Sequence, residues 1–260
     1  MLDGVSKSKI KYFRSLKYKK YRELSNEFLI EGTRIISSAL EANTFLKTVL
    51  ITDTFKDSPS SQHILKDLDN VGISIKVVNN KTMKSIATTE HPSGIAGVCS
   101  LPETQNNFIH TKQPFIFLDT ISNPGNIGTI LRSASWFGIR NVALSPNCVE
   151  PFNPKSIRAG MGAHFHLNFQ ENTLLKTFVK ENYWIIGSSP SGSSYLKWEN
   201  PLKKKNWVLV LGNESNGISE ENQALLNEII SIPKYGTGES LNVATSAGIL
   251  LSHLTRFGIS

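Results

Sequence analysis

The chain has 260 residues, a hydrophobic share of 39% and a net charge of +7, so it can form a buried core, divide into two domains and attract a polyanionic partner. It has no apolar run near the roughly 20 residues that a membrane helix needs, and no apolar segment follows its basic N-terminus, so neither a membrane protein nor a secreted one is expected. Its two cysteines, Cys99 and Cys148, cannot form a disulfide framework and fit the reducing cytoplasm.

The first feature along the chain is a basic segment, residues 6–22, that contains no acidic residue. Its cations can neutralise phosphates, which makes it the predicted RNA-binding segment. The interleaved aromatic residues either stack on bases or fill the core beneath a solvated helix, and these residues are Tyr12, Phe13, Tyr18 and Tyr21. The predicted RNA-binding residues are Lys7, Lys9, Lys11, Arg14, Lys17, Lys19, Lys20 and Arg22.

Strands and helices alternate through the rest of the first hundred residues, which predicts a small α/β domain. The predicted strands are 28–32, 48–52, 73–78 and 95–100. Periodic apolar residues predict helices at 33–40, 63–70 and 81–87. The polar stretch 102–114 has no periodicity and is the predicted linker, so the expected domains are residues 1–104 and 105–260.

The second half predicts a parallel sheet covered on both faces, because its strands are almost continuously apolar and are joined by helices. The predicted strands are 115–118, 141–144, 184–187, 207–211 and 229–232. The predicted helices are 126–137, 174–181, 220–226 and 241–256. Ligands bind beyond the carboxyl ends of strands in such sheets, so the polar loops there are the candidate site.

Several common sites are missing from the sequence. There is no GxxxxGKS or GxxxxGKT phosphate loop and no GxSxG nucleophile elbow. Residues 160–162 and 236–238 have a GxG pattern but lack the third glycine of a dinucleotide loop. His164 and His166 are expected to share one face of a strand, and no cysteine or carboxylate pair has metal-ligand spacing, so no metal site is expected.

Two polar segments follow the predicted strands 115–118 and 207–211. In NPGNIGTILR, residues 123–132, Asn126 is expected to cap a helix, and Arg132 either binds a phosphate bidentately or is a surface arginine. In LGNESNGI, residues 211–218, Gly212 permits a ligand to approach the backbone. Glu214 there can bind a polar ligand group or orient an arginine, and an ordinary turn before a capped helix is the alternative.

A third polar segment, IPKYGTGESLNVATSAG, spans residues 232–248 after the last predicted strand. Ser240 is expected to cap the following helix, and a hydrogen bond in its first turn is the simplest role of Asn242. Small residues further along let another backbone approach closely, and these are Ala244, Ala247 and Gly248.

Together and in this order, the three segments resemble the SpoU (TrmH-like) family of RNA ribose methyltransferases in the SPOUT superfamily. The first half is similar to that family's ribosomal-protein-like domain through its basic leader, FLIEGTRIISSAL (28–40) and GIAGV (94–98). The resemblance implies an α/β protein with a trefoil-knotted, parallel-sheet methyltransferase domain at its C-terminus, preceded by a small α/β RNA-binding domain. It also implies a homodimer.

The resemblance further implies S-adenosylmethionine as cofactor and methyl transfer to a ribose 2'-hydroxyl of RNA. The length and extra domain favour ribosomal RNA over transfer RNA, and an antibiotic-resistance methylase or a catalytically inactive RNA-binding protein are further alternatives. The implied cofactor-binding residues are Gly212, Asn213, Ile232 and Leu241. The implied catalytic residues are Asn126, Arg132, Glu214, Ser240 and Asn242, with the arginine reaching the partner subunit's site. The chain departs from the family at Gly160, where relatives often have serine.

Overall fold

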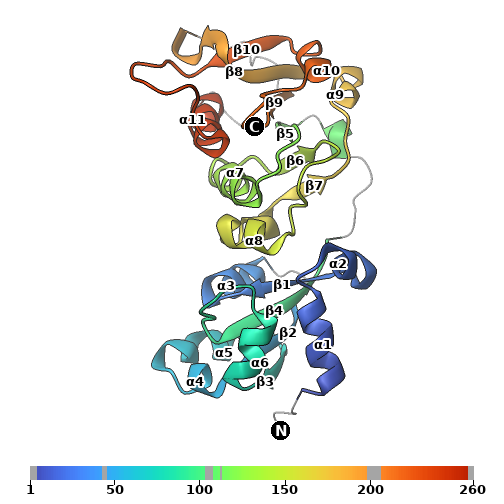
Figure 1. The fold of residues 1–260 in the computed structure, drawn as a ribbon, viewed down its shortest axis with the longest axis vertical. Coiled ribbons are helices and arrows are strands. Elements are labelled where there is room, and N and C mark those ends of the chain that lie inside the picture. Colours follow the sequence, from blue (N-terminus) through green and yellow to red (C-terminus); the bar gives the residue numbers. More distant parts are fainter. Residues whose placement is uncertain (1–4, 43–45, 103–107, 112, 198–205, 257–260) are drawn as a thin grey trace. The chain divides into compact units, whose positions relative to one another are not determined.

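The structure, a computed structural model, describes residues 5–42, 46–102, 108–111, 113–197 and 206–256. Contacts divide the chain into two compact units, each built on one sheet (Figure 1). One unit is Met1–Glu103 with Phe152–Phe165, and the other is Thr104–Pro151 with His166–Ser260. The predicted domain boundary at residue 104 stays a prediction, and residues 152–165 pack with the first unit.

The first unit has a four-stranded sheet in the order β1-β4-β2-β3. The outer strand β1 (Glu27–Glu31) and the inner strand β2 (Leu46–Ile51) pair antiparallel with β4 (Ile95–Ser100), and β3 (Ser74–Val77) pairs parallel with β2. The helices of this unit are α1 (Lys7–Ser15), α2 (Lys19–Ser25), α3 (Thr33–Glu41), α4 (Asp53–Lys56), α5 (Gln62–Asn70), α6 (Asn80–Ile86) and α8 (Pro154–Gly160). The strands and helices predicted for residues 28–100 are confirmed, whereas α4 lies in a polar stretch with no predicted helix.

The core of the first unit has a layer of helices on one face of the sheet. Phe13 and Leu16, from α1 and its C-cap, pack with Met83 and Ile86 of α6. The sheet contributes Leu29, Leu50, Ala96 and Val98 to this cluster. The basic segment is therefore an amphipathic helix pair whose inward residues hold it on the sheet.

The second unit has a six-stranded parallel sheet in the order β10-β8-β9-β5-β6-β7, so the predicted parallel sheet is confirmed. Its strands are β5 (Phe115–Leu118), β6 (Asn141–Leu144), β7 (Asn168–Gln170), β8 (Trp184–Ser194), β9 (Trp207–Leu211) and β10 (Glu228–Ser231). Its helices are α7 (Pro124–Trp136), α9 (Lys176–Lys180), α10 (Glu220–Gln223) and α11 (Val243–Thr255). Two departures from the predicted elements are β7 and the longer β8.

Both faces of this sheet are covered. Phe115 and Phe117 of β5 pack against Phe178 of α9, with ring centroids 5.0 and 6.0 Å away. Ile116 points to the opposite face, because side chains alternate along a strand, and it is also fully buried. Helices α7 and α11 lie side by side (Figure 1), and a Cβ added at Gly248 would lie 3.7 Å from Ser133 Oγ, which supports the predicted close approach at the small residues.

The prediction that His164 and His166 share one face of a strand is wrong. Helix α8 ends at Met161 in the left-handed conformation, and Gly162 follows at φ +97°, so the chain turns into a short 3-10 helix, Ala163–His166. His164 is buried there and His166 is exposed. Within the described ranges, no group of three or more His, Cys, Asp and Glu side chains is placed to hold a metal ion. None of the helices in those ranges has both the length and the apolar character of a membrane span.

Candidate functional site

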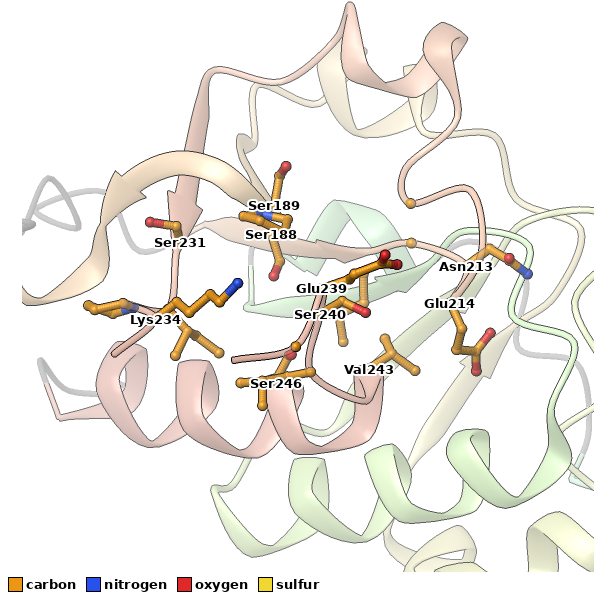
Figure 2. Close-up of a pocket in the computed structure, with 18 of the residues that line it drawn as sticks. Ser188, Ser189, Asn213, Glu214, Ser231, Lys234, Glu239, Ser240, Val243 and Ser246 are labelled. Carbon is orange, nitrogen blue, oxygen red and sulfur yellow. The ribbon is translucent and has the colours of Figure 1, made fainter. Parts of the chain in front are cut away.

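A cavity of about 670 Å³ lies at the carboxyl ends of β9 and β10 and beside the middle of β8 (Figure 2). Residues between Leu211 and Gly217 line it from the loop after β9, and residues between Ser231 and Ser246 line it from the segment after β10. This volume falls within the roughly 300–1,000 Å³ of small-molecule sites. The second and third segments singled out in the sequence therefore meet at one binding-sized cavity.

The loop after β9 is held by its own polar groups. The backbone N–H of Asn213 donates to Gly217 O at 2.9 Å, and the N–H of Gly217 donates back to Asn213 O at 2.8 Å. The Asn213 side chain accepts from the Ser215 N–H at 2.9 Å and donates to Thr120 O at 3.0 Å. A Cβ at Gly212 would lie 2.2 Å from the Gly217 carbonyl carbon, so the backbone that approaches Gly212 in this structure is that of the loop itself.

Three of the predicted catalytic residues form one hydrogen-bonded chain. The Asn242 amide Nδ2 donates to Asn126 Oδ1 at 3.0 Å, and Asn126 Nδ2 donates to Glu214 Oε1. Asn242 Oδ1 accepts from the Ala244 N–H at 2.9 Å, which fixes which end of its amide faces Asn126. These two hydrogen bonds link the first turn of α7 and the N-cap of α11 to the loop after β9, so all three polar segments meet.

Both predicted helix caps are wrong by a few residues. Asn123 caps α7, accepting from the Gly125 N–H at 2.8 Å, because Pro124 takes the first helical position, where its missing N–H costs nothing. Asn126 therefore lies inside the first turn, and its side chain faces Glu214. Asn242 caps α11 in place of Ser240. Ser240 lies two positions earlier, where it is exposed and lines the cavity.

The structure brings most of the predicted site residues together. All four predicted cofactor-binding residues line the cavity, and so do two of the predicted catalytic ones; these are Gly212, Asn213, Ile232, Leu241, Glu214 and Ser240. Asn126 and Asn242 adjoin the cavity through Glu214. Arg132 is not among the described residues that line the cavity, and it lies on the exposed face of α7.

Sequence reasoning missed a third wall of the cavity. The pairing of β8 with β10 jumps from Gly187 opposite Ile229 to Ser193 opposite Ile230, which leaves residues 188–192 outside the ladder. Ser188, Ser189 and Pro190 from this interruption line the cavity. Figure 2 shows the two serines across the cavity from Val243 and Ser246. The run SSPSG was a usable signal, because Pro and Gly in a strand mark bulges.

Asp119, directly after β5, fixes the segment that follows the loop carrying Glu214. Asp119 is only 1% exposed, and its Oδ2 accepts from the backbone N–H and the hydroxyl of Ser219 at 2.8 and 2.9 Å. This anchors the start of α10 directly after the loop that carries Glu214. Nearby, Cys148 Sγ donates to Leu118 O at 3.2 Å, and burial raises the pKa of its thiol, so Cys148 stays protonated and weakly nucleophilic at neutral pH.

The predicted RNA-binding cations divide into exposed and buried residues. The exposed ones are Lys7, Lys9, Lys11, Arg14, Lys19 and Lys20. Lys17 is half-buried and its Nζ donates to Ser85 O at 2.9 Å, while burial lowers the pKa of its ammonium group. The prediction that Arg22 contacts RNA is wrong, because its side chain is 2% exposed and donates to Leu16 O at 2.7 Å, joining α2 to the end of α1.

Comparison with known protein families matches nearly the whole chain. Residues 113–252 match the SpoU rRNA Methylase family, and residues 7–97 match the MRM3-like substrate binding domain. The chain is 31% identical to the 23S rRNA (guanosine(2553)-2'-O)-methyltransferase RlmP of Bacillus subtilis (strain 168). That similarity covers 97% of this chain and 98% of the relative.

Solved structures share the fold. A TrmH-family protein of Porphyromonas gingivalis superposes with a TM-score of 0.83 at 29% identity, covering 98% of this chain and 100% of that one. An AdoMet-bound rRNA methyltransferase of Sinorhizobium meliloti superposes with a TM-score of 0.82, covering 99% of each chain. Its identity is 24%, so this second similarity concerns the fold alone.

Proposed function

Because the chain belongs to the SpoU rRNA Methylase family, we propose that it transfers a methyl group from S-adenosylmethionine to a ribose 2'-hydroxyl of ribosomal RNA. The observation that carries this proposal is the hydrogen-bond network of Asn242, Asn126 and Glu214, which lies beside a cavity at the carboxyl ends of parallel strands. It joins the three segments on which the family resemblance rests. The choice of ribosomal RNA is supported by the name of the Bacillus relative, which modifies 23S rRNA.

The cavity fits the proposed cofactor in size and in the chemistry of its walls. Backbone groups of two loops and the hydroxyls of Ser188, Ser189 and Ser240 offer hydrogen bonds to a polar ligand. Gly212, Asn213, Ile232 and Leu241 are the residues that we propose to hold it. When bound, the cofactor supplies a methyl group on a sulfonium with a good leaving thioether, so the protein's task is mainly alignment and removal of a proton.

The side chains around the cavity suit positioning better than proton transfer. Both ends of the Asn126 amide are occupied by Asn242 and Glu214, so we propose that it fixes the geometry of the three segments. Ser240 is exposed at the cavity and is free to orient the ribose. A guanidinium can bind a phosphate through two parallel hydrogen bonds, so we propose that Arg132 binds the adjacent phosphate and stabilises the developing alkoxide. That phosphate or water then accepts the proton.

Arg132 leads to the proposal of a homodimer. It lies on α7 one turn before Trp136, whose side chain is 84% exposed, and tryptophan is enriched in protein–protein interfaces. We propose that this face of α7 meets a second copy and that Arg132 serves the partner's cavity. Mixing Arg132→Ala subunits with Gly212→Ala subunits, which carry a damaged cavity, should then restore methyl transfer in the heterodimer. Absence of rescue in verified heterodimers would place the whole site within one chain.

We also propose the trefoil knot that the resemblance implies for the C-terminal domain. This proposal rests on membership of the family, and the meeting of the segments around residues 211–217 and 231–246 at one cavity agrees with it. Mechanical extension of this domain from its two ends to a fully straight chain would contradict the knot. Within the predicted linker, 102–114, residues 103–107 and 112 lie outside the described residues, and Phe108–Thr111 forms a short 3-10 helix. Cleavage of this segment by a protease at low concentration is the test of the domain division.

The deciding experiment for the activity is transfer of labelled methyl from S-adenosylmethionine to unmodified ribosomal and transfer RNA, followed by digestion to nucleosides. We expect label in a 2'-O-methyl nucleoside of ribosomal RNA, lost in Arg132→Ala and retained in Val71→Ala, a change at an exposed side chain of the first unit. Label only in transfer RNA would select that substrate instead. RNA binding without cofactor binding would support the inactive alternative, and near-full activity of Arg132→Lys would refute the bidentate role of the arginine.

A further inference from the structure

Two tyrosines of the basic segment have no role in the core. Phe13 is 5% exposed in the core of the first unit, and the Tyr12 hydroxyl donates to Glu27. Tyr18 and Tyr21, by contrast, are 65% and 45% exposed. Their ring centroids are 6.5 Å apart with an interplanar angle of 63°, so they form one adjacent pair on the surface of α2.

The helix that carries this pair is firmly fixed. The buried Arg22 guanidinium donates to Leu16 O at 2.7 Å, which joins α2 to the end of α1. The N–H of Tyr21 donates to Tyr18 O at 3.1 Å, and Asn26 closes the helix in the left-handed conformation. Aromatic rings on a fixed backbone lose little conformational entropy when a partner binds, which favours their use as contact residues.

The surroundings of the pair are cationic. Lys19 and Lys20, exposed between the two tyrosines in sequence, and Arg14, exposed on α1, can bind phosphates. Glu23 forms an ion pair with Lys19 at 3.6 Å, but both side chains are about 60% exposed, so the pair is weak and easily exchanged. Stacking surfaces beside phosphate-binding cations are the combination that binds single-stranded nucleic acid.

We propose that Tyr18 and Tyr21 form a stacking site for unpaired bases of the RNA substrate, with Lys19 and Lys20 binding the flanking phosphates. The inference rests on the proposed function for the nature of the partner and adds the kind of RNA element that the first unit recognises. Bases in a duplex hide their faces, so the element is a loop, bulge or unpaired strand. A protein partner fits less well, because a specific protein interface covers roughly 800 Å² on each side, whereas the apolar patch here is Tyr18, Tyr21 and Leu24.

The test measures RNA affinity of the full chain with two probes, an unmodified 23S rRNA transcript and a ten-nucleotide oligouridine. Tyr18→Ala and Tyr21→Ala should each weaken binding by roughly 5- to 100-fold, while Tyr18→Phe and Tyr21→Phe should stay near wild type, because a stacked base needs the ring and not the hydroxyl. Val71→Ala, an exposed apolar residue of the same unit, is the matched control. Lys19→Ala and Lys20→Ala should each reduce the slope of log affinity against log salt by about 1, which the tyrosine variants should leave unchanged.

A second readout locates the contact directly. Oligouridine containing 5-iodouridine should crosslink to Tyr18 or Tyr21 on irradiation, and the alanine variants should lose that crosslink. Unchanged affinity and crosslinking in the Tyr18→Ala Tyr21→Ala double variant would overturn the proposal, and an accompanying change in oligomeric state would assign the patch to protein contact. Equal losses in the Phe and Ala variants would also overturn it, because they would point to hydroxyl hydrogen bonds.

Methyl transfer measured on the same proteins separates this inference from the proposed activity. If wild type binds RNA through the tyrosines but transfers no methyl group, the stacking site stands and the enzymatic proposal fails. If wild type transfers methyl groups and the double variant has the same KM for RNA, the enzymatic proposal stands and the stacking site is refuted. The expected result is a raised KM for RNA with little change in kcat.

Discussion

Replacing Gly212 by alanine should damage the loop that carries Glu214. The new Cβ would lie 2.2 Å from the backbone of Gly217 and Ile218, and ordinary contact begins near 3.4 Å, so about 1.2 Å of movement is required. Backbone atoms cannot rotate away as a side chain can, so the displacement must pass into residues 213–217. Overpacking of this kind costs about 1 to 3 kcal/mol. We therefore expect unfolding of the second unit about 2 to 10 °C below wild type.

Thermal unfolding with and without S-adenosylmethionine, together with calorimetric binding of the cofactor, measures both consequences. Gly236→Ala is the matched control, because Gly236 lines the same cavity and nothing lies within 4 Å of its added Cβ. The control should unfold at the wild-type temperature, whereas Gly212→Ala should unfold earlier and bind the cofactor at least about tenfold more weakly. Equal unfolding temperatures for Gly212→Ala and Gly236→Ala would refute the packing argument, whatever the cofactor does.

Three further changes test the contacts on which the two units depend. Arg22→Ala should lower the free energy of unfolding by about 2 kcal/mol, because it removes the donor from a buried carbonyl, while exposed Lys20→Ala should stay within about 0.5 kcal/mol by urea denaturation. Asn126→Asp places a carboxylate in contact with Glu214 and should reduce methyl transfer more than about tenfold near neutral pH. Adding Glu214→Gln restores an amide donor to this contact and should recover activity. A double variant as inactive as the single one would contradict the positioning role. Burial and a hydrogen bond to a carboxylate raise the pKa of Tyr12 from 10.0 to about 12, so its contribution to stability is complete below pH 10 and is lost as pH rises to about 12. The difference in free energy of unfolding between wild type and Tyr12→Phe should therefore narrow between pH 10 and 12. A difference that stays constant over this range would be evidence against the raised pKa.

The sequence predicted the second unit well because its strands are buried on both faces. Runs such as FIFL (115–118) and WVLVL (207–211) leave little alternative to a central parallel strand, and both are fully buried. The carboxyl ends of such strands meet at one edge, so segments distant in sequence could be assigned to one site. The family resemblance supplied the roles that geometry alone could not, and membership of the family is confirmed.

The errors share a physical origin, which is that local polar patterns have several structural solutions. Asn123 and Asn126 are equally good caps by composition, and the position of Pro124 decides between them. Arg22 continues the run of cations in sequence, yet the turn between α1 and α2 directs it toward a buried carbonyl that needs a donor. The wall at residues 188–192 depends on a break in strand register, which pairing across the sheet determines and a single strand does not reveal.

The charges of the cavity explain why catalysis on RNA should need residues from outside it. Among the described residues that line it, Glu214 and Glu239 are acidic and Lys234 is basic, a formal balance of −1. That sign suits a ligand with a sulfonium and repels an RNA phosphate at close range. Further cations that suit phosphate do not line the cavity, and they include Arg132 on the exposed face of α7 and the lysines of α1 and α2. If a second subunit delivers Arg132, its substitution should raise the KM for RNA and lower kcat while the affinity for S-adenosylmethionine stays unchanged. Weakened cofactor binding in Arg132→Ala would instead mean that the arginine shapes the cavity itself.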